Sequence, residues 1–333
     1  MNSLDATKSP TPTGPARFRL SPVELISRFG LLVAWAAVVI LFCILSPDVF
    51  ATTRNLQITL STQSVLLILT LALLPALAAG EYDLSVAGVL GVSYVLIGWL
   101  NVVHGWPILP TILVALAAGV IVGIVNALLI VGIGIESLVA TLGMGTLLAG
   151  VAIGINNASV AGIDPGFVDL ARTSILGVQL AFWFGLALTF LLWYLFTQTP
   201  VGRYLFVVGA GRDVARLTGI RVDAIRAGSL ILASTLAAVA GIVLAGIQGS
   251  ADPNSGPSHL LPAFASAYLG STAIRPGRFN AWGAFCAVYF LATGITGLQI
   301  VGLSGWIEQV FYGGSLIFAV IFSHLARRRL GES

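Results

Sequence analysis

The sequence predicts an all-α integral membrane protein with about ten transmembrane helices. Of its 333 residues, 57% are hydrophobic and only 9% are charged, and the mean hydropathy is +1.00. Soluble domains contain roughly 45–50% apolar residues, so this composition excludes an ordinary soluble protein. Apolar stretches close to the ~20 residues needed to cross a bilayer recur along the chain, and helices satisfy the backbone of such stretches in lipid.

Ten apolar stretches each predict one helix. In chain order they are 30–45, 56–79, 84–103, 108–131, 137–155, 174–197, 227–248, 259–272, 281–300 and 306–324. The stretch 259–272 is short for a span, so a broken or re-entrant helix is its alternative.

The two ends of the chain and one internal segment lie outside these stretches. Residues 1–27 are polar, contain four prolines and lack the apolar core of a secretory signal, so they predict a disordered cytoplasmic tail. Residues 28–326 form the predicted membrane domain, and 327–333 form a second cytoplasmic tail. Within the membrane domain, residues 199–226 carry five arginines between apolar stretches. We call them the charged segment.

The arginine clusters predict the orientation of the chain. Six predicted helices separate the basic N-terminal tail from the charged segment, and four separate that segment from the basic C-terminus. All three clusters therefore lie on one side, which the positive-inside rule identifies as the cytoplasm. The same bias explains the net charge of +3 without any binding of nucleic acid.

A weak internal similarity suggests two inverted four-helix repeats. The strings IVGI at 130–133 and IVGL at 300–303 have the same offset as Gly143 and Gly313. The second to fifth helices would then correspond to the seventh to tenth, in opposite orientation, as in many transporters. Chance recurrence of short apolar strings is the alternative.

The chain carries no recognisable enzyme motif. Cys43 and Cys286 both lie within apolar runs, and the histidines His104, His259 and His324 are scattered singly. No H-E-x-x-H, G-x-S-x-G or G-x-x-x-x-G-K-[ST] motif is present. We therefore expect no catalytic residue, no cofactor and no metal, and we expect any ATP hydrolysis to occur on another subunit.

Three amides within predicted spans are candidates for a solute path. Gln63, Asn126 and Gln299 would be costly to bury unpaired, and they could bond a hydroxylated solute in a central cavity. Hydrogen bonding between helices is the alternative. Acidic residues in the first half of the chain fall at or beyond helix ends. This placement disfavours a proton-coupled carrier, which uses ionisable groups in mid-membrane.

Two motifs resemble the permease subunits of ATP-binding cassette importers for simple sugars, of the ribose, xylose, arabinose and galactose type. The first is GEYDLSVAGVLGVS at 80–93, in which Asp83, Leu84, Ser85 and Val86 match, whereas the second glycine of the motif has become Glu81. We include Asp83 and Ser85 among the candidate residues of the substrate path.

The second motif, VGRYLFVVGAGRDVARLTGI at 201–220, is the more specific of the two. Its matching residues are Gly202, Arg203, Gly209, Ala215, Arg216, Leu217, Gly219 and Ile220. The looser similarity extends over roughly 56–322 and includes LGSTAIRPGRFN. Departures at Pro262, Ser271 and Pro276 leave the identity of the sugar open.

The resemblance implies a subunit of a larger importer in the plasma (inner) membrane of a prokaryote. Two permeases, identical or related, would form the path, an extracytoplasmic sugar-binding protein would deliver the solute, and an ABC ATPase pair would dock inside. A branched-chain amino-acid or nucleoside permease is the alternative within the superfamily. An ion-coupled secondary carrier that works alone is the alternative from another class.

The resemblance also assigns a role to the charged segment, where the ATPase would grip a short helix. Residues 212–218 lie between Gly211 and Gly219, and Gly219 is placed to end a helix in the left-handed conformation. Val214 and Leu217, three residues apart, would share one face of this helix. The expected coupling residues are Gly209, Arg212, Asp213, Ala215, Arg216, Leu217 and Gly219. An ordinary positive-inside loop is the alternative.

Overall fold

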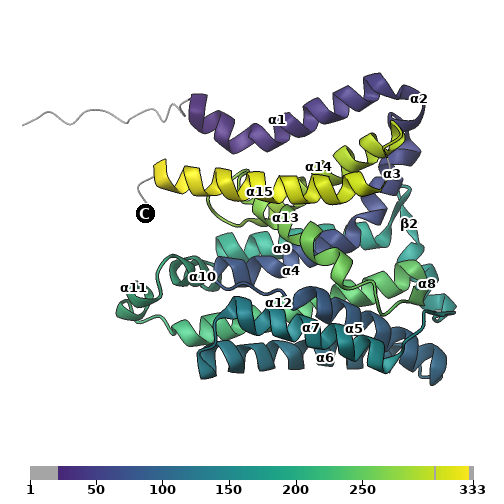
Figure 1. Ribbon diagram of the computed structural model, residues 1–333, viewed down its shortest axis with the longest axis horizontal. Coiled ribbons are helices and arrows are strands. Elements are labelled where there is room, and N and C mark those ends of the chain that lie inside the picture. The colour runs from purple at the N-terminus through teal and green to yellow at the C-terminus, as the bar shows by residue number, and fades with distance from the viewer. Residues whose placement is uncertain (1–21, 304, 330–333) are drawn as a thin grey trace, which may run out of the picture.

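The computed structural model describes residues 22–303 and 305–329 as a bundle of helices that run along one common direction (Figure 1). The helices are α1 (Pro22–Leu45), α2 (Pro47–Phe50), α3 (Thr53–Thr62), α4 (Ser64–Ala78), α5 (Val86–Gly98), α6 (Ile108–Ala127), α7 (Ser137–Ile155), α8 (Pro165–Arg172), α9 (Leu180–Gln198), α10 (Pro200–Ala210), α11 (Arg212–Leu217), α12 (Val222–Gln248), α13 (Leu260–Gly270), α14 (Ala281–Ile300) and α15 (Trp306–Arg329). Wider π-helical turns extend α5 through Trp99–Val103 and α6 through Leu128–Ile133.

Two antiparallel strand pairs lie at one end of this bundle. β1 (Val160–Ala161) pairs with β4 (Ser250–Ala251), with Val160 opposite Ala251. β2 (Ser174–Ile175) pairs with β3 (Val178–Gln179), with Ser174 opposite Gln179.

The helices are long and apolar enough for a multi-pass membrane protein. Six of those within the described residues could each cross a bilayer, and α3 with α4, bent by 42°, forms a seventh candidate. The predicted class of all-α membrane protein is therefore confirmed, whereas ten crossings and inverted repeats remain predictions. The eleven residues of α13 extend only ~16 Å, about half of the ~30 Å hydrocarbon core, which favours a broken helix there.

Two predicted helix starts within the chain are wrong, and a third, that of the first helix, is wrong as well. The stretch 174–197 begins with the β2–β3 hairpin, because Leu176 and Gly177 both have positive φ and form its two-residue turn. The stretch 227–248 begins earlier, at Val222, so that Asp223 and Arg226 become helical. By contrast, α7 and α14 begin and end at the predicted residues.

The predicted N-terminal tail overlaps the first helix. α1 begins at Pro22, within the segment 1–27 that was expected to be a tail. Residues 1–21 and 330–333 lie outside the described part of the chain, so the remaining tail predictions fall there.

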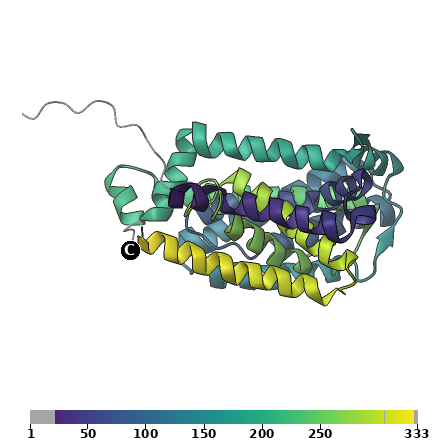
Figure 2. The same cartoon turned by 90° about the horizontal axis from the view of Figure 1, so that it is seen from above.

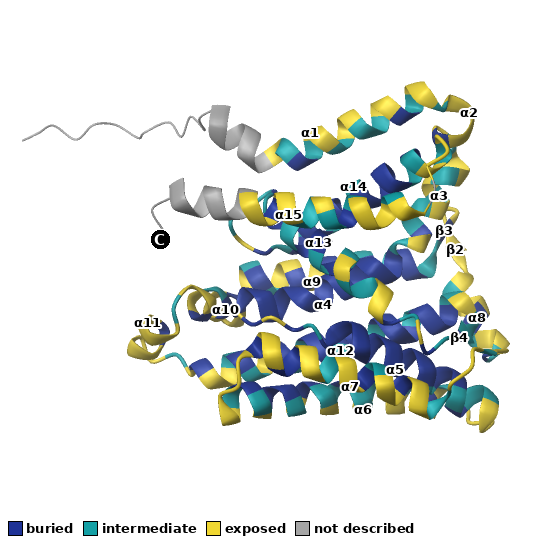
Figure 3. Ribbon diagram, in the orientation of Figure 1, coloured by how far each residue is buried: buried dark blue, intermediate teal, exposed yellow. Residues whose placement is uncertain are grey.

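α4 is the centre of the bundle. Its sequence SVLLILTLALLPALA is apolar on all sides, and every residue from Ser64 to Ala78 is buried. A helix that is hydrophobic all round needs such a position. α5 and α12 are also largely buried, whereas α6 and α7 expose apolar faces suited to lipid (Figure 3).

The two ends of the bundle differ in what they carry. The beginning of α1, the helix α11 and the end of α15 lie at one end in both views (Figures 1 and 2). The strand pairs and α8 lie at the opposite end. The parity of the three basic clusters and the side of the membrane that this end faces remain predictions.

Candidate functional site

The most unusual stretch of backbone is the connection 79–85 between α4 and α5. It is not helical, yet Glu81, Asp83 and Ser85 are all buried. Irregular backbone in a membrane bundle must find partners within the protein. α7 supplies them: the hydroxyls of Ser137 and Thr141 accept hydrogen bonds from the backbone N–H groups of Tyr82 and Leu84, at 3.1 and 3.0 Å.

Three predicted path residues meet in this connection as one buried polar chain. The Oδ1 atom of Asp83 accepts hydrogen bonds from the backbone N–H and the hydroxyl of Ser85, at 3.0 and 2.5 Å. The hydroxyl of Ser85 in turn accepts a hydrogen bond of 2.8 Å from the side-chain amide of Asn126 in α6. We call Asp83, Ser85 and Asn126 the polar chain.

Two hydrogen-bond acceptors of the polar chain have no donor among the described residues. Asp83 Oδ2 and Asn126 Oδ1 are buried without a hydrogen-bond partner among residues 22–303 and 305–329. A buried acceptor without a donor costs roughly 1–3 kcal/mol. Burial raises the pKa of Asp83 to about 6, although the hydrogen bonds from Ser85 oppose this rise. The carboxyl group is therefore still mostly ionised at pH 7 and takes up a proton as the pH falls through about 6.

The other two candidate path residues lie elsewhere. Gln63 stands between α3 and α4, and the fifteen residues of α4 put ~22 Å between it and the connection. Gln299 is exposed near the end of α14. The structure therefore brings Asp83, Ser85 and Asn126 together but leaves Gln63 and Gln299 apart from them.

Glu81 binds two arginines that come from distant parts of the chain. Its Oε1 atom lies 2.9 Å from Arg212 Nη2 of α11 and 2.5 Å from Arg226 Nε of α12. Glu81 is 1% exposed and the side chain of Arg226 is 10% exposed, whereas Arg212 remains 44% exposed. A polar cavity of about 580 Å³ adjoins this cluster.

Sequence reasoning missed this cluster. It noted Glu81 only as a departure from a motif and counted Arg226 only as a topology signal. The substitution of glycine by Glu81 was the available signal, because a carboxylate beside a buried motif needs a cationic partner. Which of several arginines supplies that partner depends on the packing of α12 and α11.

The end of α10 packs directly on the same connection. A Cβ atom at Gly209 would overlap the carbonyl oxygen of Ala78, so only glycine permits this approach. From the other side, a Cβ atom at Gly80 would lie 3.4 Å from Cα of Gly209. The expected coupling residue Gly209 is thus a site of close contact between α10 and the connection.

The predicted short helix is present as α11. Ala215 is buried and packs with Val208 and Val222, which anchors the helix to its neighbours. Gly219 has φ of +81° and ends this helix in the left-handed conformation, as predicted. The opposite face is bare, because Val214 is 64% and Leu217 is 89% exposed.

The remaining charges of α11 lie at the surface. Arg216 forms an ion pair of 3.3 Å with Asp223, and both side chains are more than half exposed. Asp213 is almost fully exposed. Figure 2 shows α11 beyond the ends of the long helices.

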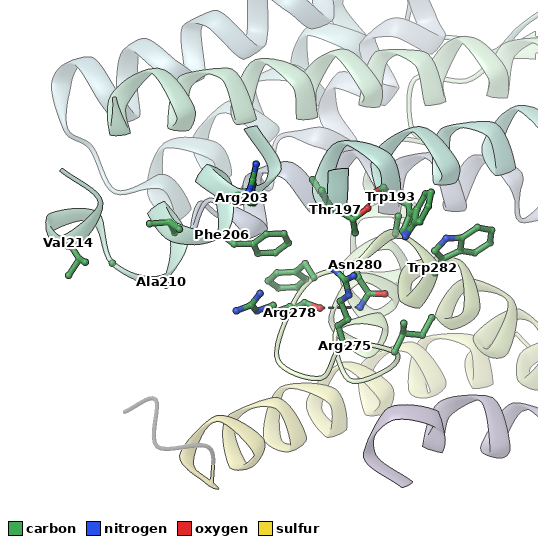
Figure 4. Close-up of a pocket in the computed structure, with 16 residues that line it drawn as sticks. Trp193, Thr197, Arg203, Phe206, Ala210, Val214, Arg275, Arg278, Asn280 and Trp282 are labelled. Atoms are coloured by element: carbon green, nitrogen blue, oxygen red, sulfur yellow. Dashed lines mark hydrogen bonds between the residues drawn. The ribbon is translucent and has the colours of Figure 1, made fainter. Parts of the chain in front are cut away.

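A second cavity, of about 720 Å³, opens beside α10 and α11 (Figure 4). Arg203 of α10 and Arg275 and Arg278 of the α13–α14 connection are among the residues that line it. The guanidinium of Arg278 lies 5.9 Å from the ring centre of Phe206. None of the described residues that line this cavity is acidic.

Comparison with known protein families identifies the family of this chain. The family described as branched-chain amino acid transport system / permease component matches residues 55–320, a range that includes the connection 79–85 and α11. The chain belongs to this permease family. It is accordingly a multi-pass membrane protein of the permease type.

Curated relatives match the chain along most of its length. The D-allose transport system permease protein of Escherichia coli (strain K12) is 27% identical over 299 residues, which cover 90% of this chain and 92% of that protein. The L-arabinose ABC transporter permease protein of Azospirillum brasilense is 27% identical over 330 residues and covers 96% and 95%. An autoinducer 2 import system permease protein of Photorhabdus laumondii is 29% identical over 304 residues and covers 88% and 91%. No solved structure matches this one.

Proposed function

We propose that this protein is the transmembrane permease subunit of an ATP-driven importer for a monosaccharide or a similar polyol. The family description names branched-chain amino acids, and an amino-acid permease is therefore the second candidate. The relatives named for D-allose and L-arabinose align over at least nine-tenths of both chains, which favours a sugar.

The observation that carries this proposal is the bare face of α11. Apolar side chains that project into water beyond a bundle mark a protein interface. Six helical residues extend only ~9 Å, so α11 fits a single groove on a partner. We assign that groove to a separate ATPase subunit, which hydrolyses ATP while this chain does not.

Within the coupling segment, residues divide into those that contact the ATPase and those that shape the helix. Asp213, Arg216 and Leu217 are exposed and would meet the partner. Ala215 and Gly219 would fix the helix, and Gly209 and Arg212 would hold it against the connection 79–85.

The polar chain is our candidate for the inner part of the substrate path. Sugar hydroxyls are donors as well as acceptors, and the unused oxygens of Asp83 and Asn126 could accept from them. Gln63 and Gln299, near the opposite end of the bundle, would lie closer to the point of entry.

The proposed topology has ten passes with α13 as a broken one, and both termini and α11 face the cytoplasm of a prokaryotic inner membrane. Residues 28–326 form the permease domain in this proposal. The two halves would be inverted repeats. The partners would be an ABC ATPase, an extracytoplasmic sugar-binding protein and a second permease, identical or related.

Reconstitution tests this proposal directly. The purified permease in lipid nanodiscs, with its ATPase and a sugar-loaded binding protein, should show stimulated ATP hydrolysis and, in proteoliposomes, sugar uptake. Leucine with an amino-acid-binding protein serves as the comparison. Uptake by the permease alone, driven by a proton or sodium gradient, would establish a secondary carrier instead.

A further inference from the structure

We infer that Glu81 is the link through which α11 displaces the polar chain, so that ATPase motion reaches the substrate path through the connection 79–85. This inference rests on the proposed function and adds the residue that transmits the motion. Glu81 is a positioning residue, since it touches neither the ATPase nor the solute in this assignment.

The connection touches the coupling segment at two points. At the first, the backbone of Gly209 lies against Ala78 and Gly80 with no room for a side chain. At the second, Arg212 of α11 binds Glu81 at 2.9 Å. Two separate contacts constrain both the position and the rotation of the connection relative to α11.

The ion cluster at Glu81 favours movement of Glu81 together with α11 over movement of α11 past Glu81. Glu81 is 1% exposed, so separating it from its arginines would leave a buried charge without a partner. Arg226 keeps Glu81 bound to α12, while Arg212 reaches it from the solvent side. The chain runs from α11 into α12 through residues 218–221, so a displacement of α11 that α12 follows carries Glu81 with it and keeps both of its ion pairs.

The polar chain moves with Glu81 because the segment from Glu81 to Ser85 is short and is hydrogen-bonded to α7 and α6. Only Tyr82 separates Glu81 from Asp83, and the backbone of Tyr82 is bonded to Ser137 of α7. Ser85 then bonds Asn126 of α6. Movement at Glu81 must therefore change the geometry among Asp83, Ser85 and Asn126.

Arg216 provides the internal contrast. It lies on the same six-residue helix, but it binds Asp223 at the surface, where water screens the pair. Of the two arginines on α11, only Arg212 connects this helix to the buried connection.

The test uses the reconstituted complex of permease, ATPase and loaded binding protein. Arg212→Gln leaves Glu81 paired with Arg226, so folding should be preserved. We expect this variant to co-purify with the ATPase and to keep the basal rate of ATP hydrolysis. The stimulation of hydrolysis by loaded binding protein should fall about tenfold, which is the effect of removing one charge-assisted hydrogen bond. Arg221→Gln is the matched control, because Arg221 is exposed and lies in the same segment.

A double-variant cycle tests whether the two residues act as one link. Glu81→Gln should show a similar loss, and the double variant Glu81→Gln with Arg212→Gln should be no worse than the more impaired single variant. If Glu81→Gln does not assemble, the comparison of Arg212→Gln with Arg221→Gln decides alone.

Three outcomes would overturn the inference: equal stimulation in Arg212→Gln and Arg221→Gln, additive losses in the cycle, or loss of ATPase binding in Arg212→Gln. In each case Leu217→Asp separates this failure from that of the proposed function. If Leu217→Asp still abolishes ATPase binding, α11 docks the partner and only the link is wrong. If it leaves binding intact, the docking role of α11 is wrong as well.

Discussion

α11 and the connection 79–85 are neighbouring segments that interrupt the long helices. They differ in which kind of side chain they expose to solvent and which they bury. α11 exposes Val214 and Leu217 to water, whereas the connection buries Glu81 and Asp83 in an apolar bundle. Each arrangement is unfavourable for the isolated chain. The bare face of α11 fits the proposed ATPase partner, whereas the connection satisfies most of its polar groups internally. Its buried acceptors without a partner among the described residues are Glu81 Oε2 and Asp83 Oδ2.

The largest expected effect comes from reversing the apolar character of α11. Leu217→Asp should weaken ATPase association by about 30-fold or more, the effect of losing an interface hot spot of ~2 kcal/mol. Co-purification and titration of the ATPase against permease in nanodiscs would measure it. Leu217→Met keeps the apolar contact and should bind almost normally; an equal loss in both variants would contradict a hydrophobic docking face.

A second substitution tests the shape of α11 without changing its exposed face. Gly219→Val places a β-branched residue at φ of +81°, which costs roughly 1–3 kcal/mol and should tilt or fray the helix. Sugar uptake should fall several-fold at normal membrane abundance. Gly228→Ala, in a helical position with open space, is the matched control and should transport normally. Normal uptake by Gly219→Val would argue that α11 is only a topology signal.

Replacing the amides Asn126 and Gln63 should reduce uptake to different extents. Asn126→Leu removes the bond to Ser85 and one unused acceptor, so uptake should fall more than membrane abundance. Gln63→Leu, ~22 Å away, should have a smaller effect. Quantitative blotting and uptake assays on both variants give the ratio. Loss of abundance in Asn126→Leu, with normal uptake per molecule, would reduce the polar chain to helix packing.

The smallest expected effect is a pH dependence of stability from Asp83. Its pKa is raised from 3.8 to about 6, so the folded protein binds this proton more tightly than the unfolded chain. The free energy of unfolding therefore decreases as pH rises from about 4 to about 6 and then levels off. Thermal unfolding in detergent at pH 4.5 and 7 should differ more for the wild type than for Asp83→Asn. Equal differences would place the titration elsewhere.

Much of the fold was predictable because periodic or continuous apolarity is a local property. Ser137–Ile155 and Ala281–Ile300 have the predicted bounds, and the short helix ended by Gly219 lies where the glycines placed it. The β2–β3 hairpin was missed because Ser174–Gln179 is apolar enough to resemble helix, and its turn uses Leu176 at positive φ, which no residue preference indicates.

The individual residues of the candidate site could be predicted from the sequence, but their contacts with one another could not. Asp83 and Ser85 were selected from one motif and Asn126 as an amide within a span, and nothing in the sequence connected Asn126 with the other two. Gln63 and Gln299 had the same chemical argument but lie elsewhere, because the register and direction of each helix decide which polar groups meet.

The sequence is sufficient to predict a helical membrane protein, and Gly211 and Gly219 bound the short helix expected over residues 212–218. These properties follow from side-chain transfer energies and backbone preferences, which act locally. The pairing of Glu81 with Arg212 and Arg226, 131 and 145 residues away along the chain, depends on the tertiary structure. The physical reason is that a buried charge selects its partner by distance in space, and helix packing alone sets that distance.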